Sequence, residues 1–585
     1  MLENIDSAAL RKIGASLQRP ADSMSCAPTL PQNDGPADQV ERAAQLFLVQ
    51  QIYAYNPSSG LPMPMAVERA ALLQAAEILD WVEGWLGVQV SIFADIEVWK
   101  LETWNSVISK LDDYKKIFTL FAVPDIAQNQ TWQDDGVFGS QRLAGLNPLA
   151  VSLVTEEGEG VNWGALSQKL SPAILGAQYD GQALTDIMQD GRLYVTDYVS
   201  LQGVVPEGQF QMAPVALYVK PRDFPGLMPL AIQLTQNPGD DYAYLAPQGP
   251  QNEVDYRWLM AKSYLQCADL SQNQIINHLA LTHLIEEAFA LATHRHLAWQ
   301  HPLFRLLDKH LTALMVINQL GMITLVNPGG LVDKVLDVRL AGAMKLIETA
   351  YASWTFDDMG LPAQLKGRGV SDTGQLPYYP YRDDGLLIWN RLGQYVDEYL
   401  GLYYKSDGDV TGDYELQNWA QQLSGASDSG AGKVPGFPNQ ITTRAQLSDI
   451  IQRIIWTAGP QHAAVNFPQT EFTNFIPNAP GAITAEPPQG VVDESALVGL
   501  LPGKDATAAQ FQTTYALAYY HYDQLLDYHL CAEDGSEQLV RKYQQLLVAT
   551  DRAVIVERNQ QRAAQPGLLA YPYFLPENIP NSTSV

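Results

Sequence analysis

The stretch NQIINHLALTHLIEEAFALATHRHLAWQHPLFRLLDKH, residues 273–310, decides the interpretation of the whole chain. Its apolar residues recur at helical spacing, and the surrounding segment 256–299 is long enough for many turns of helix. Six of the nine histidines in the sequence lie between His278 and His310. This concentration indicates either a helix with scattered core and surface histidines or a site where imidazoles converge on one point.

The spacing of these histidines bears on that choice. On an ordinary α-helix, residues five apart lie about 140° from one another and do not share a face. Asn273 and His278 have this spacing, and so do His278 and His283. Two such residues converge only where the helix contains a π-type turn, which is rare and often functional. We therefore expect a π-type turn if this long helix carries a site.

A second cluster lies in QHAAVNFPQ, residues 461–469. His462 and Asn466 are four residues apart and share one helical face. Imidazole is the commonest transition-metal ligand, and a side-chain amide oxygen is a weaker one. The same spacing is also typical of a buried polar network, so the pattern by itself leaves both interpretations open.

Composition and charge exclude several function classes. The 36 Lys and Arg against 64 Asp and Glu give a net charge of −28, which argues against nucleic acid and disfavours docking on anionic lipid. A hydrophobic fraction of 46% with 17% charged residues is typical of a globular protein with a large core. Three widely spaced cysteines exclude a cysteine-ligated zinc or iron–sulfur site. The sequence predicts no transmembrane segment and no signal peptide, so we expect a cytoplasmic protein.

The order of patterns along the chain predicts a mainly α fold with three parts. Residues 1–40 read as a flexible lead-in and 41–139 as an N-terminal helical segment. Short β-prone runs between Gly and Pro turns at 140–240 predict a small β-ribbon or sheet, and long helical patterns follow from about residue 254. Taken alone, the last five residues, NSTSV, look like a frayed tail.

Seven runs of residues, in order, carry a family resemblance. They are RLAGLNP (142–148), LYVTDY (193–198), THLIEEAFALATHRHLAWQHPLFRLL (282–307), YASWTFDDMGLPAQLKGRG (351–369), LPYYPYRDDGLLIWN (376–390), QHAAVNFPQ (461–469) and IPNSTSV (579–585). The chain resembles the lipoxygenases, non-haem iron enzymes that peroxidise polyunsaturated fatty acids. The resemblance covers residues 140–585 as the catalytic domain, and it is closest in type to short bacterial members without an N-terminal β-barrel.

The resemblance implies one iron held by three histidines, an asparagine and the α-carboxylate of the last residue. Aligned on the family pattern, four of these roles fall on His278, His462, Asn466 and Val585. Gln469 matches a residue that hydrogen-bonds close to the metal ligands. A terminal ligand implies that the tail runs inward rather than fraying, with Ile579, Pro580 and Ser582 ordered.

The remaining ligand position departs from the family pattern. The first histidine of the family's His-x4-His pair falls on Asn273, and an amide oxygen is a weaker ligand than an imidazole. Three interpretations follow: a working site with an altered ligand, a metal-poor relative, or an engineered substitution. The alternative alignment makes His278 and His283 the pair. Manganese suits mixed nitrogen and oxygen ligands as iron does.

The resemblance also implies a substrate pocket. Gly321 stands at the position where family members carry Gly for R products and Ala for S products, so we expect an R hydroperoxide. Leu325, Val332 and Leu517 match residues that line the pocket, with plain core packing as the alternative. The implied partners are dioxygen and a fatty acid with a cis,cis-1,4-pentadiene, and transient membrane contact is compatible with such a substrate.

Three functions are therefore compared. The first is an iron dioxygenase that converts polyunsaturated fatty acids to hydroperoxides. The second is a lipid-binding pseudoenzyme that keeps the fold and the pocket but has little turnover. The third is a helical scaffold with incidental histidines, which the ordered motif matches disfavour.

Overall fold

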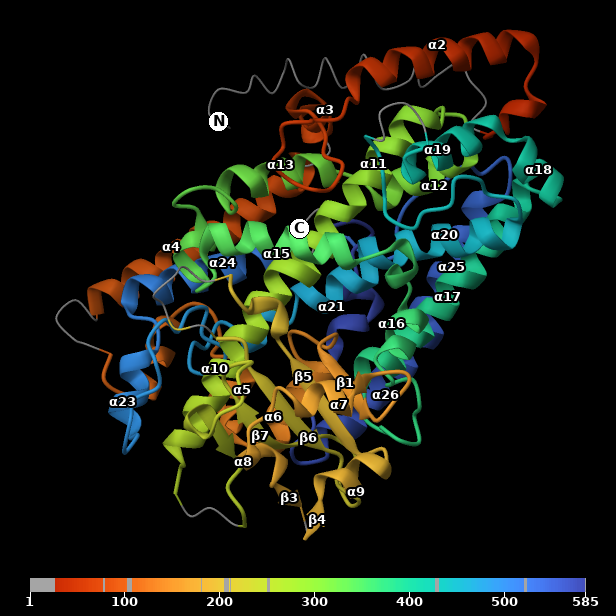
Figure 1. Cartoon of the computed structure of the whole chain (residues 1–585). Helices are drawn as coiled ribbons and strands as arrows, with labels where there is room; N and C mark the ends of the chain where they lie inside the picture. The colour runs from red at the N-terminus through yellow and green to blue at the C-terminus, as the bar shows by residue number, and fades with distance from the viewer. Residues whose placement is uncertain are drawn as a thin grey trace.

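The computed structural model describes residues 27–583, apart from 77–78, 103–107, 180, 205–209, 211, 250–252, 427–430 and 520–522. The fold is mainly helical, with a small sheet at one end of the helical body (Figure 1). Among the described residues, no helix combines the length and the apolar character needed to cross a membrane.

One long helix runs through the core. It consists of α10 (Tyr256–Gln272), the π-helix η8 (Asn273–Leu284) and α11 (Ile285–His296), which follow one another without a break. The Asp255 carboxylate begins it by accepting hydrogen bonds from the backbone N–H groups of Arg257 and Trp258. Every residue from 285 to 293 is buried, so this helix is surrounded by other elements. The π-type turn expected from the sequence is present and extends over the whole of η8.

A second interrupted helix lies beside η8. It consists of α20 (Arg444–Trp456), the π-helix η11 (Thr457–Gln461) and α21 (His462–Asn466). Pro460 lies inside η11, where it has no N–H to offer to the helical ladder. The two π-helical segments therefore lie next to one another in the centre of the molecule.

The sheet has six strands in the order β2-β1-β5-β6-β7-β8. Their bounds are Val151–Thr155 (β1), Val161–Asn162 (β2), Leu193–Asp197 (β5), Val215–Val219 (β6), Met228–Gln233 (β7) and Ala243–Leu245 (β8). Only the β1–β2 pair is parallel, and the β6–β7 register shifts between Leu217 and Tyr218. Strands β3 (Gln178–Tyr179) and β4 (Gln182–Ala183) form a separate hairpin. The small sheet predicted between residues 140 and 240 is confirmed.

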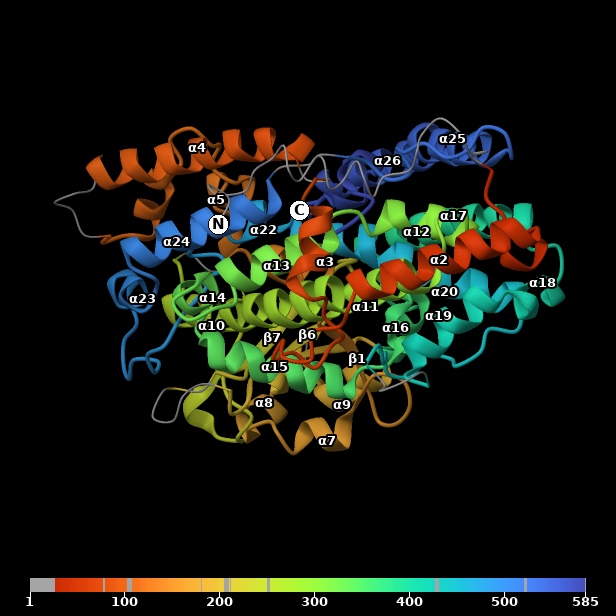
Figure 2. The ribbon, with the colours of Figure 1, turned by 90° about the horizontal axis from the view of Figure 1, so that it is seen from above.

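The other long helices surround the two interrupted ones (Figures 1 and 2). They are α2 (Pro36–Ile52), α4 (Leu79–Glu102), α6 (Asp135–Ala144), α12 (Pro302–His310), α13 (Leu314–Thr324), α15 (Arg339–Ser353), α17 (Pro380–Tyr403), α19 (Tyr414–Ser424), α24 (Lys504–Ala518), α25 (Ser536–Leu546) and α26 (Arg552–Ala563). The short helices are α3 (Glu68–Leu73), α5 (Asp125–Gln128), α7 (Trp163–Ser167), α8 (Pro172–Leu175), α9 (Leu184–Gln189), α14 (Leu331–Val335), α16 (Leu361–Gly367), α18 (Asp407–Gly412), α22 (Gln469–Phe472) and α23 (Glu494–Leu500). A third π-helical segment, η12 (Leu547–Asp551), joins α25 to α26.

Helix α2 begins within the range that the sequence assigns to the lead-in. The sequence places residues 36–40 in the flexible lead-in, but they form the first turn of α2, whose first residue is Pro36. Proline suits that position because its fixed φ matches the helix and its missing N–H would have no helical partner there. Residues 1–26 of the expected lead-in lie outside the described residues. The largest buried cluster extends from Leu30 to Ile579 and includes Ala70 and Ala71 of α3, whereas Ile92, Ile96 and Trp99 of α4 pack in a smaller cluster with Phe511.

Candidate metal centre

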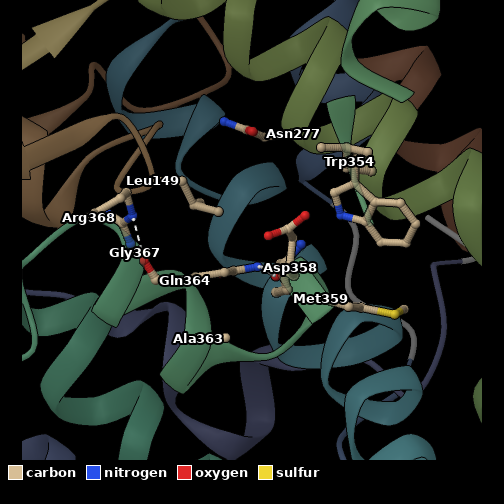
Figure 3. Close-up of a pocket in the computed structure, with 11 residues that line it drawn as sticks. Leu149, Asn277, Trp354, Asp358, Met359, Ala363, Gln364, Gly367 and Arg368 are labelled. Atoms are coloured by element: carbon tan, nitrogen blue, oxygen red, sulfur yellow. Dashed lines mark hydrogen bonds between the residues drawn. The ribbon is translucent and has the colours of Figure 1, made fainter. Parts of the chain in front are cut away.

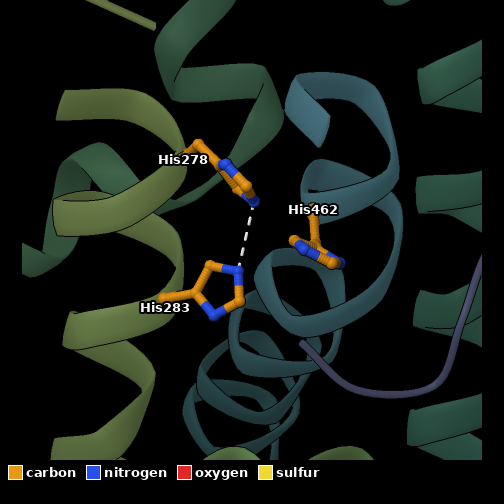
Figure 4. A group of neighbouring side chains, drawn as sticks. All are labelled: His278, His283 and His462. Carbon is orange, nitrogen blue, oxygen red and sulfur yellow. Dashed lines mark hydrogen bonds between the residues drawn. The ribbon is translucent and has the colours of Figure 1, made fainter. Parts of the chain in front are cut away.

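Three buried imidazoles converge where the two π-helical segments meet (Figure 4). His278 and His283 come from η8 and His462 from the start of α21, and their ligand nitrogens all lie within 4.8 Å of one another. The Nε2 atoms of His278 and His283 are 3.1 Å apart. Residues five apart are nearly superposed along a π-helix, because its hydrogen bonds join residue i to residue i+5. The unusual helix thus brings together two histidines that an α-helix would point in different directions.

Asn273, a candidate ligand from the sequence, lies on the same π-helix as His278 and His283. Asn273 is fully buried, but its amide nitrogen donates to the backbone oxygen of Val465 at 2.9 Å. The structure groups His283 with His278 and His462. The Oδ1 atom of Asn273 is also buried and has no hydrogen-bond partner among the described residues, so the assignment of Asn273 as a ligand stays a prediction.

Asn466 and Gln469 form a buried hydrogen-bonded pair that follows His462 in the chain. Asn466 is fully buried one turn beyond His462, and its amide nitrogen donates to the backbone oxygen of Leu517 at 2.9 Å. The Gln469 amide donates to Asn466 Oδ1 at 2.5 Å. These two bonds fix which end of the Asn466 amide is the oxygen. That oxygen keeps a second lone pair for a cation.

Burial keeps the imidazoles of His278 and His283 neutral. It lowers the pKa of His278 well below the usual value, and the neighbouring His283 lowers it further. Burial also lowers the pKa of His283 to about 4. A neutral imidazole has a free lone pair, as a metal ligand requires. Three buried imidazoles with an amide oxygen suit a transition metal such as iron or manganese better than magnesium or calcium, which prefer oxygen ligands.

The backbone around His283 is held by a buried network. The Asn318 amide, from α13, donates to the backbone oxygen of His283 at 3.0 Å and to the Glu287 carboxyl at 2.7 Å. The same carboxyl accepts from the backbone N–H of Ala66 at 2.7 Å. Burial raises the pKa of Glu287 to about 7. Residues from three distant parts of the sequence therefore fix the position of η8 next to the site.

The C-terminal segment turns inward. The described tail residues 579–583 are all buried, as a tail that runs toward the core requires. The frayed-tail interpretation is therefore wrong for this part of the chain. Val585, the expected carboxylate ligand, lies outside the described residues.

The predicted pocket residues lie on or next to three helices, of which α13 contacts η8. Gly321 is on α13, Leu325 follows it, Val332 is on α14 and Leu517 is on α24, and all four are half-buried. The backbone N–H of Leu325 donates to the oxygen of Gly321, and that of Val332 donates to the oxygen of Leu325. The helices α14 and α24 are in contact, as are α13 and η8. Gly321 therefore lies on a helix that contacts η8, and the backbone oxygen of Leu517 accepts a hydrogen bond from Asn466.

A pocket that the sequence did not predict lies beside the same helices (Figure 3). Its volume is about 340 Å³, and it is lined by Leu149, Asn277, Leu281, Trp354, Asp358, Met359, Ala363, Gln364, Gly367, Arg368 and Gln461. Asn277 and Gln461 immediately precede His278 and His462 in the chain. Seven of the lining residues belong to the run 351–369, which carried the family resemblance without indicating a pocket. None of Gly321, Leu325, Val332 and Leu517 lines it.

The buried His310 side chain predicts a specific pH dependence of the free energy of unfolding. Burial lowers the pKa of His310 to about 4, whereas an unfolded histidine titrates near 6.5. Between these values the unfolded chain binds a proton that the folded chain does not, so His310 lowers stability as the pH falls through this window. We expect His310→Gln to gain about 3 kcal/mol relative to the wild type between pH 7.5 and pH 4.

This comparison is made by denaturant unfolding at several pH values. Buried carboxyls act in the opposite direction, since burial raises the pKa values of Glu287 and Glu471 to about 7. They are present in both chains and cancel from the difference. A stability difference that does not change with pH would contradict the prediction.

Comparisons with known proteins agree with this geometry. The family model described as Lipoxygenase matches residues 86–522. The chain is 33% identical over 499 residues to Linoleate 9/13-lipoxygenase of Pseudomonas aeruginosa, and the match covers 81% of this chain and 70% of that protein. It is 31% identical over 517 residues to the Allene oxide synthase-lipoxygenase protein of Plexaura homomalla, covering 83% of this chain and 46% of that protein.

Solved structures give the same result. A coral 8R-lipoxygenase superposes with a TM-score of 0.82 at 28% identity, covering 96% of this chain and 83% of that chain. A Delta413-417:GS LOX solved in complex with arachidonate gives 0.85 at 28% identity, with the same coverage. The family match extends over most of the chain and includes both histidine-bearing helices. The chain therefore belongs to the lipoxygenase family.

Proposed function

We propose that the protein is a non-haem iron dioxygenase that converts polyunsaturated fatty acids to hydroperoxides. The proposed ligands are His278, His283, His462, Asn466 and the α-carboxylate of Val585. The observation that carries the proposal is the convergence of three buried imidazoles within 4.8 Å. Bound iron would supply the one-electron chemistry that removes a hydrogen atom from the bis-allylic carbon of the substrate. Manganese would fit the same nitrogen and oxygen atoms.

The residues of the chain contribute position and environment. Burial keeps His278 and His283 unprotonated, so no proton has to leave before a cation binds. Gln469 orients the Asn466 oxygen, and such supporting contacts commonly contribute 10- to 100-fold to metal affinity. The surrounding buried helices exclude bulk water from the site. One structural neighbour was solved in complex with arachidonate, which supports a fatty acid as the substrate here.

The basic test combines metal content with turnover. Purified protein should contain about one iron per chain, and addition of linoleate with dioxygen should raise the absorbance of a conjugated diene. Manganese in place of iron would support the site but change the metal assignment. A protein that binds fatty acid but contains no metal and forms no diene would establish the lipid-binding pseudoenzyme instead.

Gly321 is proposed to direct oxygen addition toward an R product. A Cβ atom added at Gly321 would meet only Leu325 Cδ1, at 3.9 Å, so this position has room for a methyl group. We infer that this space gives dioxygen access to one end of the pentadienyl radical. The coral neighbour is an 8R-lipoxygenase whose structure was described as giving a basis for product chirality, which supports examining this property here.

We expect Gly321→Ala to shift the product toward the S hydroperoxide and to change the R to S ratio at least about tenfold. A tenfold change requires the added methyl group to raise the free-energy barrier to oxygen addition at one end of the radical by only about 1.4 kcal/mol. Chiral chromatography of the reduced products measures this ratio. Because an alanine inside a helix is more stable than a glycine by about 0.5–1 kcal/mol, the variant should fold at least as well as the wild type. An unchanged ratio in a stable, active variant would rule out this role.

A further inference from the structure

The last described residues of the chain are held by a buried set of hydrogen bonds centred on Asn581. Asn581 is 3% exposed, and its side-chain nitrogen donates to Asp523 Oδ2 at 2.8 Å and to the backbone oxygen of Gln524 at 2.9 Å. Its side-chain oxygen accepts from the backbone N–H of Leu526 at 2.8 Å. Its own backbone N–H lies 3.3 Å from both Asp523 oxygens. Both ends of the Asn581 amide are therefore engaged.

A histidine completes this set. The Nδ1 atom of His310 lies 3.0 Å from the backbone oxygen of Asn581, and its Nε2 atom lies 3.1 Å from the hydroxyl of Tyr528. That hydroxyl in turn lies 3.1 Å from the hydroxyl of Tyr395 on α17. We refer to Asn581, Asp523, Leu526 and His310 as the Asn581 clamp. It joins the tail to α12 and, through the two tyrosines, to α17.

The backbone of the clamp is strained. Leu526 is fully buried and has a φ of 61°, in the left-handed region that non-glycine residues seldom adopt. Such a conformation persists only where the surrounding contacts determine it, and it is found preferentially at functional positions. In this case the strained residue presents its N–H to the side chain of Asn581. The loop is therefore shaped to receive this one asparagine.

The held tail lies directly on the helix that carries His462. A Cβ atom at Gly459, inside η11, would come within 2.6 Å of the backbone oxygen of Pro580. Only glycine allows this close approach, three residues before His462. Figure 4 shows a coil in the colour of the C-terminal end of the chain passing beside this helix. Ser582 adds a bond from its hydroxyl to the backbone oxygen of Thr312 at 2.8 Å.

We propose that Asn581 and Gly459 are positioning residues that place the end of the chain beside the three histidines. This inference rests on the proposed metal site, and it adds the residues that position the terminal ligand. Asn581 is four residues from Val585, a span of at most about 14 Å. The clamp fixes the chain four residues before the α-carboxylate. Releasing the clamp moves the nearest fixed point farther from this group along the chain, which is expected to lower its effective concentration at the metal.

The test measures iron affinity in two variants that release the tail in different ways. Asn581→Ala removes the clamp bonds, and Gly459→Ala keeps them but pushes against Pro580. Competition with a chelator should show about 10- to 100-fold weaker ferrous iron binding in each, the range typical of lost supporting contacts at metal sites. Hydrogen exchange should show faster exchange of the 579–583 amides, while strands β5 and β6 exchange as in the wild type.

Each variant has a matched control. Asn578→Ala removes another tail asparagine, whose amide donates to the backbone oxygen of Pro572 away from the clamp. Gly499→Ala adds a methyl group where no atom lies within 4 Å. Both controls should bind iron as the wild type does. Because Gly459→Ala removes no hydrogen bond, it still provides the test if Asn581→Ala does not fold.

The outcomes separate this inference from the function on which it rests. The positioning role would be overturned if Asn581→Ala and Gly459→Ala both bind iron as the wild type does while His283→Ala binds it more weakly. That result would still support the proposed metal site. A wild type that binds no ferrous iron would overturn both. Equal losses in a variant and in its control would also reject the clamp, because the effect would then be a general one.

Discussion

Replacing His283 with alanine is expected to leave less than about a tenth of the bound iron and to lower kcat/KM by at least about 10³-fold. His283 supplies one of the three imidazoles that converge, and its Nε2 atom lies 3.1 Å from that of His278. Loss of a ligand should exceed the 10- to 100-fold effects seen when only a supporting contact is lost. Metal analysis and the initial rate of diene formation measure the two effects.

The paired experiment is Asn273→His, for which the two alignments of the sequence predict opposite results. If Asn273 stood in place of a ligand, the new histidine would restore metal binding. The proposed ligand set with His283 predicts no gain, because the Asn273 side chain is buried and its amide nitrogen already donates to the backbone oxygen of Val465. The larger ring should destabilise the fold by about 1–3 kcal/mol. A large gain in iron content would show that His283 had been wrongly assigned.

The second large effect concerns stability. Asp269→Leu is expected to lower the free energy of unfolding by about 3–5 kcal/mol, because it leaves the Arg142 guanidinium buried without its counter-charge. Arg142 Nη1 lies 2.6 Å from Asp269 Oδ2, and both residues are at most 2% exposed. The other Asp269 oxygen accepts from the hydroxyl of Tyr198 at 2.6 Å and from the amide of Asn147 at 2.9 Å. Denaturant unfolding at pH 7 measures the loss.

Two further variants check the cause. The double variant Arg142→Met with Asp269→Leu removes both charges of this pair, so it should be more stable than Asp269→Leu alone. Glu398→Gln breaks the exposed pair with Lys542, and it should change stability by at most about 1 kcal/mol. A double variant less stable than the single one would mean that Asp269 acts through its other partners and not through the Arg142 charge.

Much of the fold follows from local patterns. The helical spacing of apolar residues predicts the helices of the second half, and short runs between turns predict the sheet. His462 and Asn466 share a face because their spacing of four fits an α-helix, and the structure has α-helix there. In these segments local preference and tertiary packing agree, so the sequence is sufficient.

The exact ligand set could not be obtained in the same way. Asn273–His278 and His278–His283 have equal spacing, and η8 is π-helical across all three residues. Which pair faces His462 depends on how α21 packs against η8, a contact between segments almost two hundred residues apart. The pocket of Figure 3 likewise combines residues from four separate segments. Such features depend on tertiary contacts, which spacing rules do not contain.

The π-helix η8 also has a consequence for how this protein tolerates change in chain length. A π-helix turns the chain by a smaller angle per residue than the roughly 100° of an α-helix, and it brings together residues five apart. Removing one residue between His278 and His283 would leave them four apart within a π-helical segment, so their imidazoles would no longer meet as they do. A library of single-residue deletions should find none accepted in 273–284, although substitutions at its half-buried positions survive. We therefore expect this segment to tolerate substitutions better than changes in its length.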